Sequence, residues 1–153
     1  MSRKLRPIPN DLVSERDPPS RSTPPGTVLA ASATPLRFAI LEHRRDGVHW
    51  DFLVEDGPAL RAWAIDAPIV AEVDLPAREL PPHRRIYLDY EGQISGGRGS
   101  VHRWDGGECV ATGWGERAVR LEVRGAQLVG TVELRSVGDE DRRSWVFRFG
   151  KLS

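Results

Sequence analysis

The feature that most constrains the fold is a period-two alternation of apolar and polar residues, which recurs in short runs between residues 36 and 150. Glycine, proline and aspartate separate the runs, as is typical of strands joined by turns. No window shows helical spacing of apolar residues over a useful length. The chain is therefore predicted to be all-β, either an antiparallel barrel or a sandwich. Strands are predicted over residues 36–43, 48–55, 60–65, 84–90, 100–104, 108–112, 118–124, 127–135 and 144–150.

Two proline-rich stretches depart from this pattern. Residues 1–35 hold seven of the twelve prolines and lack apolar periodicity, so they are predicted to form an N-terminal tail, flexible or draped on the domain. Residues 66–82 hold four more prolines and are predicted to be a long connection, with a short helical turn at residues 77–80. The domain itself is predicted to span residues 36–153.

The composition excludes several classes of protein. A chain of 153 residues with 39% hydrophobic residues can bury a core as one domain. The single cysteine, Cys109, excludes a disulfide framework and a multi-cysteine zinc site. The 22 basic and 22 acidic residues cancel, which argues against coating of duplex nucleic acid but leaves room for a site that grips one or two phosphates. No apolar run approaches the length of a membrane span, so we expect no membrane contact and a cytoplasmic protein.

Residues 38–55 are the most informative segment and are predicted to form a hairpin. Residues 45–47 make a three-residue turn that ends in glycine, as such loops commonly do. This turn pairs His43 with His49, and side-chain alternation then places Asp51 on the same face. The opposite face is predicted to be core and carries Phe38, Ile40, Trp50, Phe52 and Val54.

Two imidazoles and a carboxylate on one face suggest a metal site. Such a set leaves coordination positions open for water or substrate and suits Mn²⁺, Fe²⁺ or Zn²⁺. The prediction depends on the register, because a one-residue slip would move every side chain to the other face. A solvated strand face that carries two histidines and an aspartate is the alternative interpretation.

A second polar row is predicted on the strand 84–90 and the residue before it. His83, Arg85 and Tyr87 fall on one face there. Arginine can bind a phosphate, tyrosine can donate a hydrogen bond and histidine can transfer a proton, although an exposed edge strand would look the same. The glycine-rich stretch 91–100 lacks the ending of a phosphate-binding loop and is predicted to be a hairpin or barrel-corner loop.

The segments below occur in order within residues 37–150. They are His43-x5-His49-x-Asp51-Phe52, Leu60-Arg61-Ala62-Trp63-Ala64, His83-x3-Tyr87-Leu88-Asp89-Tyr90-Glu91-Gly92-x-Ile94, Gly99-Ser100-Val101-x-x-Trp104-Asp105-x-Gly107 and the stretch 121–130. Together they resemble the 3′-phosphoesterase domain of bacterial and archaeal DNA ligase D and its stand-alone relatives. In the tail, Arg16-Asp17 followed by Thr23-Pro24 is similar to an N-terminal motif of that family.

The resemblance implies a small antiparallel β-barrel of about eight strands with an Mn²⁺-dependent phosphoesterase site, Zn²⁺ and Co²⁺ being alternative metals. Such an enzyme removes a 3′-ribonucleotide and a 3′-phosphate from DNA or RNA–DNA primer ends in DNA end repair. By position, His43, His49 and Asp51 would bind the metal, His83 would assist phosphoryl transfer and Tyr87 would contact the phosphate. Further substrate contacts are expected from Arg16, Asp17 and Glu55.

One departure from the family pattern bears on catalysis. The family has Asp-Phe-Arg-x-Glu, and its arginine holds the scissile phosphate, whereas this chain has Leu53 at that place on the polar face. Loss of such a charged group typically costs about 2.7–4 kcal/mol of transition-state stabilisation. We hypothesise that Arg85 takes over phosphate binding.

Two other functions remain open beside the enzyme. In the first, a weak or inactive relative binds a nucleic-acid end or a phosphate as an accessory module. Its partner would be a DNA repair ligase or polymerase, and its location would be cytoplasmic or nucleoid-associated. In the second, the barrel has no nucleic-acid role. Metal affinity separates the second from the others, and turnover separates the enzyme from the accessory module.

Overall fold

The computed structural model describes residues 34–138 and 143–152, which form nine strands, one 3₁₀ turn and no α-helix. The strands are β1 (Leu36–Arg44), β2 (Val48–Asp56), β3 (Ala59–Ile65), β4 (Leu75–Arg84), β5 (Gly92–Gln93), β6 (Ser100–Trp114), β7 (Ala118–Gly125), β8 (Val129–Ser136) and β9 (Ser144–Lys151). The 3₁₀ turn is η2 (Arg85–Leu88). Most of the predicted tail lies outside the described residues. Within them, no helix is long and apolar enough to cross a membrane.

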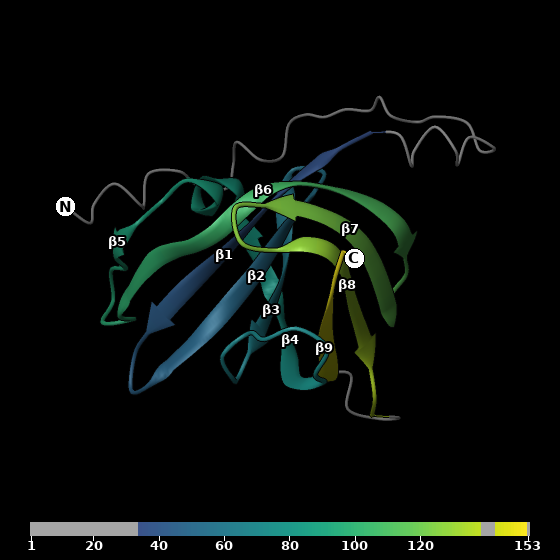
Figure 1. Cartoon of the computed structure of the whole chain (residues 1–153). Helices are drawn as coiled ribbons and strands as arrows, with labels where there is room; N and C mark the ends of the chain where they lie inside the picture. The colour runs from purple at the N-terminus through teal and green to yellow at the C-terminus, as the bar shows by residue number, and fades with distance from the viewer. Residues whose placement is uncertain (1–33, 139–142, 153) are drawn as a thin grey trace.

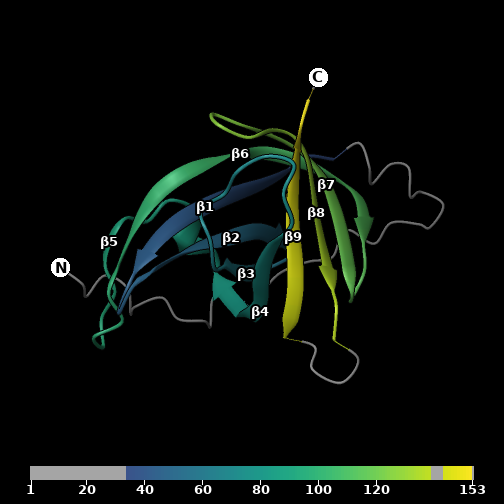
Figure 2. The ribbon, with the colours of Figure 1, turned by 60° about the horizontal axis from the view of Figure 1, so that its bottom comes forward.

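Eight strands close into an antiparallel barrel in the order β1-β2-β3-β4-β9-β8-β7-β6, and β6 returns to pair with β1. The strand β6 is 15 residues long, so it pairs with β1, with β7 and, near its start, with the extra strand β5. Figure 1 shows β6 arching over the barrel with β5 beside it, and Figure 2 shows β9 between β4 and β8. The predicted antiparallel barrel is thus confirmed.

The structure corrects the predictions for residues 66–90. The predicted strand 84–90 is wrong, because residues 85–88 form the 3₁₀ turn η2. The predicted helical turn at 77–80 is also wrong, since these residues belong to β4 and pair with β3. Pro81 and Pro82 sit where the β3–β4 register shifts, so the ladder needs no N–H from them. In addition, the predicted strands 100–104 and 108–112 are one continuous strand, β6.

The barrel has two apolar clusters, one inside and one on its outer wall. The inner cluster draws buried residues from all eight barrel strands, among them Phe38, Phe52, Trp63 and Phe147. The outer cluster lies on the other face of β1, β2 and β3, where η2 and the β5–β6 segment fold back over the wall. It contains Ala39, Leu41, Leu53, Leu60, Ala62, Leu88, Ile94 and Val101.

The outer cluster changes the interpretation of the first hairpin. The hairpin face that was predicted to be polar is polar only near the turn, and Leu53 on that face is fully buried. Leu53 therefore stabilises the outer cluster by about 1.5–3 kcal/mol, the usual value for a buried leucine side chain.

Candidate metal centre

The β1–β2 hairpin has the register that its turn predicted. His43 lies opposite His49, and Leu41 lies opposite Asp51. Residues 45–47 form the loop between the two strands, and Gly47 has a positive φ of 124° that favours glycine. The turn thus brings the two imidazoles together at the turn end of the hairpin.

The three predicted metal ligands form a compact group. Their ligand atoms all lie within 4.8 Å of one another, and no other such group is found among the described residues. The Asp51 Oδ2 atom is 3.2 Å from His43 Nδ1, and Asp51 Oδ1 is 2.9 Å from His49 Nε2. Asp51 is only 3% exposed, while both histidines are half-buried. The carboxylate therefore lies between two rings that remain reachable from solvent.

A backbone contact assigns the ring atoms of His43. Its Nε2 lies 2.8 Å from the carbonyl oxygen of Arg98. A carbonyl only accepts hydrogen bonds, so Nε2 carries the hydrogen and Nδ1 faces Asp51. Metal-bound histidines commonly donate their other ring N–H to a carbonyl in this way. The hydrogen bond with Asp51 raises the pKa of His43, although burial opposes the rise.

Asp51 has one buried carboxylate oxygen without a hydrogen-bond donor among the described residues. Burial would raise the pKa of Asp51, but the contacts with His43 and His49 outweigh burial and hold that pKa below its usual value. Its Oδ1 atom is buried and accepts no hydrogen bond of acceptable geometry within the described residues, despite the short distance to His49. An unsatisfied buried carboxylate oxygen is costly. A divalent cation held by all three residues would satisfy this oxygen, so the donor set fits a metal.

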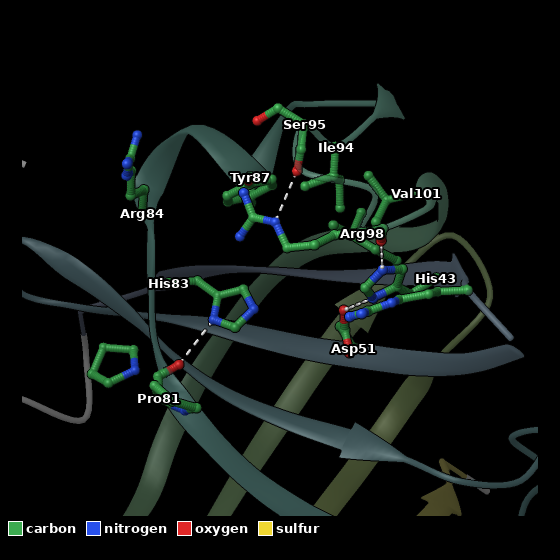
Figure 3. Close-up of a pocket in the computed structure, with 13 residues that line it drawn as sticks. His43, Asp51, Pro81, His83, Arg84, Tyr87, Ile94, Ser95, Arg98 and Val101 are labelled. Atoms are coloured by element: carbon green, nitrogen blue, oxygen red, sulfur yellow. Dashed lines mark hydrogen bonds and ion pairs between the residues drawn. The ribbon is translucent and has the colours of Figure 1, made fainter. Parts of the chain in front are cut away.

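A cavity of about 430 Å³ opens beside this group (Figure 3). His43 and Asp51 line one side, and apolar residues of the outer cluster, including Leu41 and Ile94, form part of its wall. A cavity of this size admits a small ligand or one end of a larger one. His49 is not one of the described residues that line this cavity.

His83 and Tyr87 reach the same cavity from the end of β4 and from η2. The His83 Nδ1 atom donates to the Pro81 carbonyl at 2.9 Å, which leaves Nε2 as the atom that can accept or give a proton. The rings of His83 and Tyr87 meet edge to face with centroids 5.9 Å apart. The structure therefore brings together the two residues that the sequence placed on one row, although a strand end and a turn position them.

Arg85 lies outside the cavity that His83 and Tyr87 line. A 3₁₀ turn has three residues per turn, so residues 83, 85 and 87 do not share a face as they would in a strand. The Arg85 guanidinium pairs with Glu55 at 2.5 Å and contacts the Gly57 carbonyl, and it does not line the cavity. Glu55 also accepts the backbone N–H of Arg37 at 2.7 Å. Arg16 and Asp17 lie outside the described residues.

Sequence reasoning missed three arginines that line the cavity, Arg45, Arg84 and Arg98. Arg45 lies in the β1–β2 turn, and Arg98 lies in the loop between β5 and β6, within Gly96-Gly97-Arg98-Gly99. The glycine-rich stretch was correctly predicted to be a hairpin loop. An arginine flanked by glycines was the signal that could have marked it as more than a turn.

Comparison with models of known protein families matches residues 41–135 to the family described as the DNA ligase D 3′-phosphoesterase domain. The match covers more than half of the chain and includes the turn end of the β1–β2 hairpin, the residues that line the cavity and the β5–β6 loop. A search of curated proteins gave no match.

Proposed function

This chain belongs to the DNA ligase D 3′-phosphoesterase domain family, and on that premise we propose that it is a metal-dependent phosphoesterase acting on 3′ ends of DNA or RNA–DNA primers. It would remove a 3′-phosphate or a 3′-ribonucleotide in DNA end repair and leave a 3′-hydroxyl for a repair ligase or polymerase. The observation that carries the proposal is the buried carboxylate Asp51, whose Oδ1 lacks a donor beside a cavity lined by His83 and Tyr87.

His43 through Nδ1, His49 and Asp51 would hold the metal, with Mn²⁺ proposed first and Zn²⁺ or Co²⁺ as alternatives. When bound, such an ion polarises phosphoryl oxygens and lowers the pKa of a bound water. The Arg98 carbonyl fixes the His43 ring so that Nδ1 faces Asp51. The protein's part is thus to present three ligands in one orientation and to leave the remaining positions to water and substrate.

His83 and Tyr87 would act on the phosphate itself. The Pro81 carbonyl holds the His83 ring through Nδ1, so His83 Nε2 is the atom that would donate a proton to the leaving oxygen. The Tyr87 hydroxyl would donate a hydrogen bond to a phosphate oxygen. Its ring packs against both His83 and Tyr90, which limits its movement. Apolar residues of the cavity wall, Leu41, Ile94 and Val101, would contact the terminal sugar.

A binding module is the second candidate function. Leu53 favours it, because this fully buried side chain gives the cavity no charge at the place where the family's arginine holds the phosphate. Such a module would bind metal and a nucleic-acid end without turnover.

The test is a gel assay with a primer–template that carries either a 3′-phosphate or one 3′-ribonucleotide, with and without Mn²⁺. We expect metal-dependent trimming that His49→Ala and Asp51→Ala both reduce to background, because each removes a ligand. Arg120→Ala is the matched control, since Arg120 lies on β7, pairs with Glu133 and does not line the cavity. Mn²⁺ binding without trimming would instead support the binding module, and absence of Mn²⁺ binding would refute both functions.

A further inference from the structure

Arg98 presents a guanidinium to the cavity without a carboxylate partner. Its Nε donates to the Ser95 carbonyl at 2.9 Å, and no described acidic residue pairs with it. Figure 3 shows the side chain extending from its loop toward Tyr87. Other arginines of the same region are paired: Arg37 with Asp89 and Arg44 with Glu42. The terminal nitrogens of Arg98 are therefore available to an anion, which would displace no internal ion pair.

Arg45 provides a second cation at the same cavity. It lies in the β1–β2 turn and, within the described part of the chain, its side chain makes no hydrogen bond or ion pair. The adjacent residue Arg44, by contrast, pairs with Glu42 at 2.6 Å. Two unpaired guanidinium groups thus line a cavity whose apolar wall contributes no charge.

Gly99 allows the β5–β6 loop to lie in close contact with the β1–β2 turn. A Cβ at this position would lie 2.0 Å from the Arg44 carbonyl oxygen and 2.8 Å from the Arg45 Cβ, and the φ of Gly99 is +84°. Only glycine allows the β5–β6 loop to approach the turn this closely. The close contact of Gly99 with Arg44 and Arg45 therefore brings Arg98 and Arg45, which are far apart in the sequence, to the same site.

We propose that Arg98 and Arg45 form the phosphate-binding site of this cavity and take the terminal phosphomonoester of a nucleic-acid 3′ end beside the three metal-binding residues. The proposal rests on the proposed function for the identity of the ligand. Guanidinium groups bind phosphate oxygens through paired, charge-assisted hydrogen bonds. His83 and Tyr87 lie across the same cavity, so a phosphate between the two loops would face their polar atoms.

The experiment is calorimetric titration of the Mn²⁺-loaded protein with inorganic phosphate, and with an oligonucleotide that ends in a 3′-phosphate or a 3′-hydroxyl. We expect Arg98→Ala and Arg45→Ala each to weaken phosphate binding about tenfold or more, and Arg98→Lys to restore part of the loss. Arg120→Ala, which removes the same charge from the distant strand β7, should bind like the unaltered protein.

Manganese affinity is the readout that separates phosphate binding from a structural role. Arg98→Ala keeps the carbonyl that holds His43, so its Mn²⁺ affinity should not change. Unchanged phosphate affinity in both alanine variants, or a parallel loss of Mn²⁺ affinity, would overturn the proposal. The proposed enzyme can fail separately: phosphate binding that depends on Arg98 without trimming refutes only turnover, and trimming with unchanged phosphate affinity in the variants refutes only this site.

Discussion

The Asp51 carboxylate contacts two imidazole rings, those of His43 and His49. Burial disfavours its charge, yet His43 and His49 keep the carboxylate ionised by lying within 3.2 Å and 2.9 Å of its two oxygens. The hydrogen bond with Asp51 also raises the pKa of His43, because it favours the protonated ring. A divalent ion held through Nδ1 would take the place of a proton on that atom.

This exchange predicts how Mn²⁺ affinity depends on pH. Metal binding requires neutral His43, so affinity should fall as the pH drops through its pKa, which lies above the ordinary value of 6.5. The expected slope is about tenfold per pH unit for one displaced proton. Titration with Mn²⁺ at several pH values between about 5.5 and 8.5, a range around the ordinary pKa of histidine, measures this slope. An affinity independent of pH across that range would contradict the assignment of His43 Nδ1 as a ligand.

Among the elements, the segment from η2 to the β5–β6 loop builds the cavity. Its apolar residues Leu88 and Ile94 join the outer cluster on β1, β2 and β3. That burial holds Tyr87 and Arg98 over the wall where His43 and Asp51 stand. The cavity therefore exists because a short irregular segment covers an apolar patch on the outside of the barrel.

Gly99→Ala should test this element directly. The added Cβ meets the Arg44 carbonyl, so we expect the loop to move and the protein to lose about 1–3 kcal/mol of unfolding free energy. Mn²⁺ affinity should fall about tenfold or more, since His43 loses its carbonyl partner. Denaturant unfolding and metal titration provide the two measurements.

Gly97→Ala is the matched control in the same loop. Gly97 also has a positive φ, +65°, but nothing lies within 4 Å of its added Cβ. It should show only the backbone cost, about 1–2 kcal/mol, with unchanged Mn²⁺ affinity. Equal effects of the two variants on metal affinity would show that the Gly99 contact does not position the loop.

The whole molecule separates a closed barrel interior from the site on its outer wall. The interior cluster includes Cys109, which is 2% exposed. Burial raises the pKa of Cys109 to about 12 from 9.0, with Glu55 and Glu108 adding to the effect. The thiol thus reports on whether water enters the barrel, independently of events at the candidate metal centre.

We expect Cys109 to resist alkylation in the native protein at about pH 8.5, which is near the ordinary pKa of a free thiol, and to react once the protein is unfolded. The unfolded chain ionises this thiol at lower pH than the folded one does. Its contribution to stability is therefore present below pH 9.0 and is lost as the pH rises toward about 12. Mass spectrometry after iodoacetamide treatment, with and without denaturant, measures the labelling. Rapid native labelling at pH 8.5 would contradict a closed interior.

Local rules were enough for the first hairpin. Turn length and glycine position fixed the pairing of His43 with His49, and alternation placed Asp51 beside them. The same rules failed at Arg85, because they assumed a strand where the chain makes a 3₁₀ turn after the prolines of β4. They also assigned Leu53 to a polar face, although a later segment buries it.

By itself, the amino-acid sequence determined an all-β antiparallel fold and the three clustered side chains that could hold a metal, because strand alternation and a three-residue turn act over neighbouring residues. Only the tertiary structure decided which cations face the cavity. Arg98 lies there because its loop packs against the outer wall, where its backbone carbonyl contacts His43, 55 positions away in the sequence. Such contacts depend on how distant segments pack, and short-range periodicity carries no record of that packing.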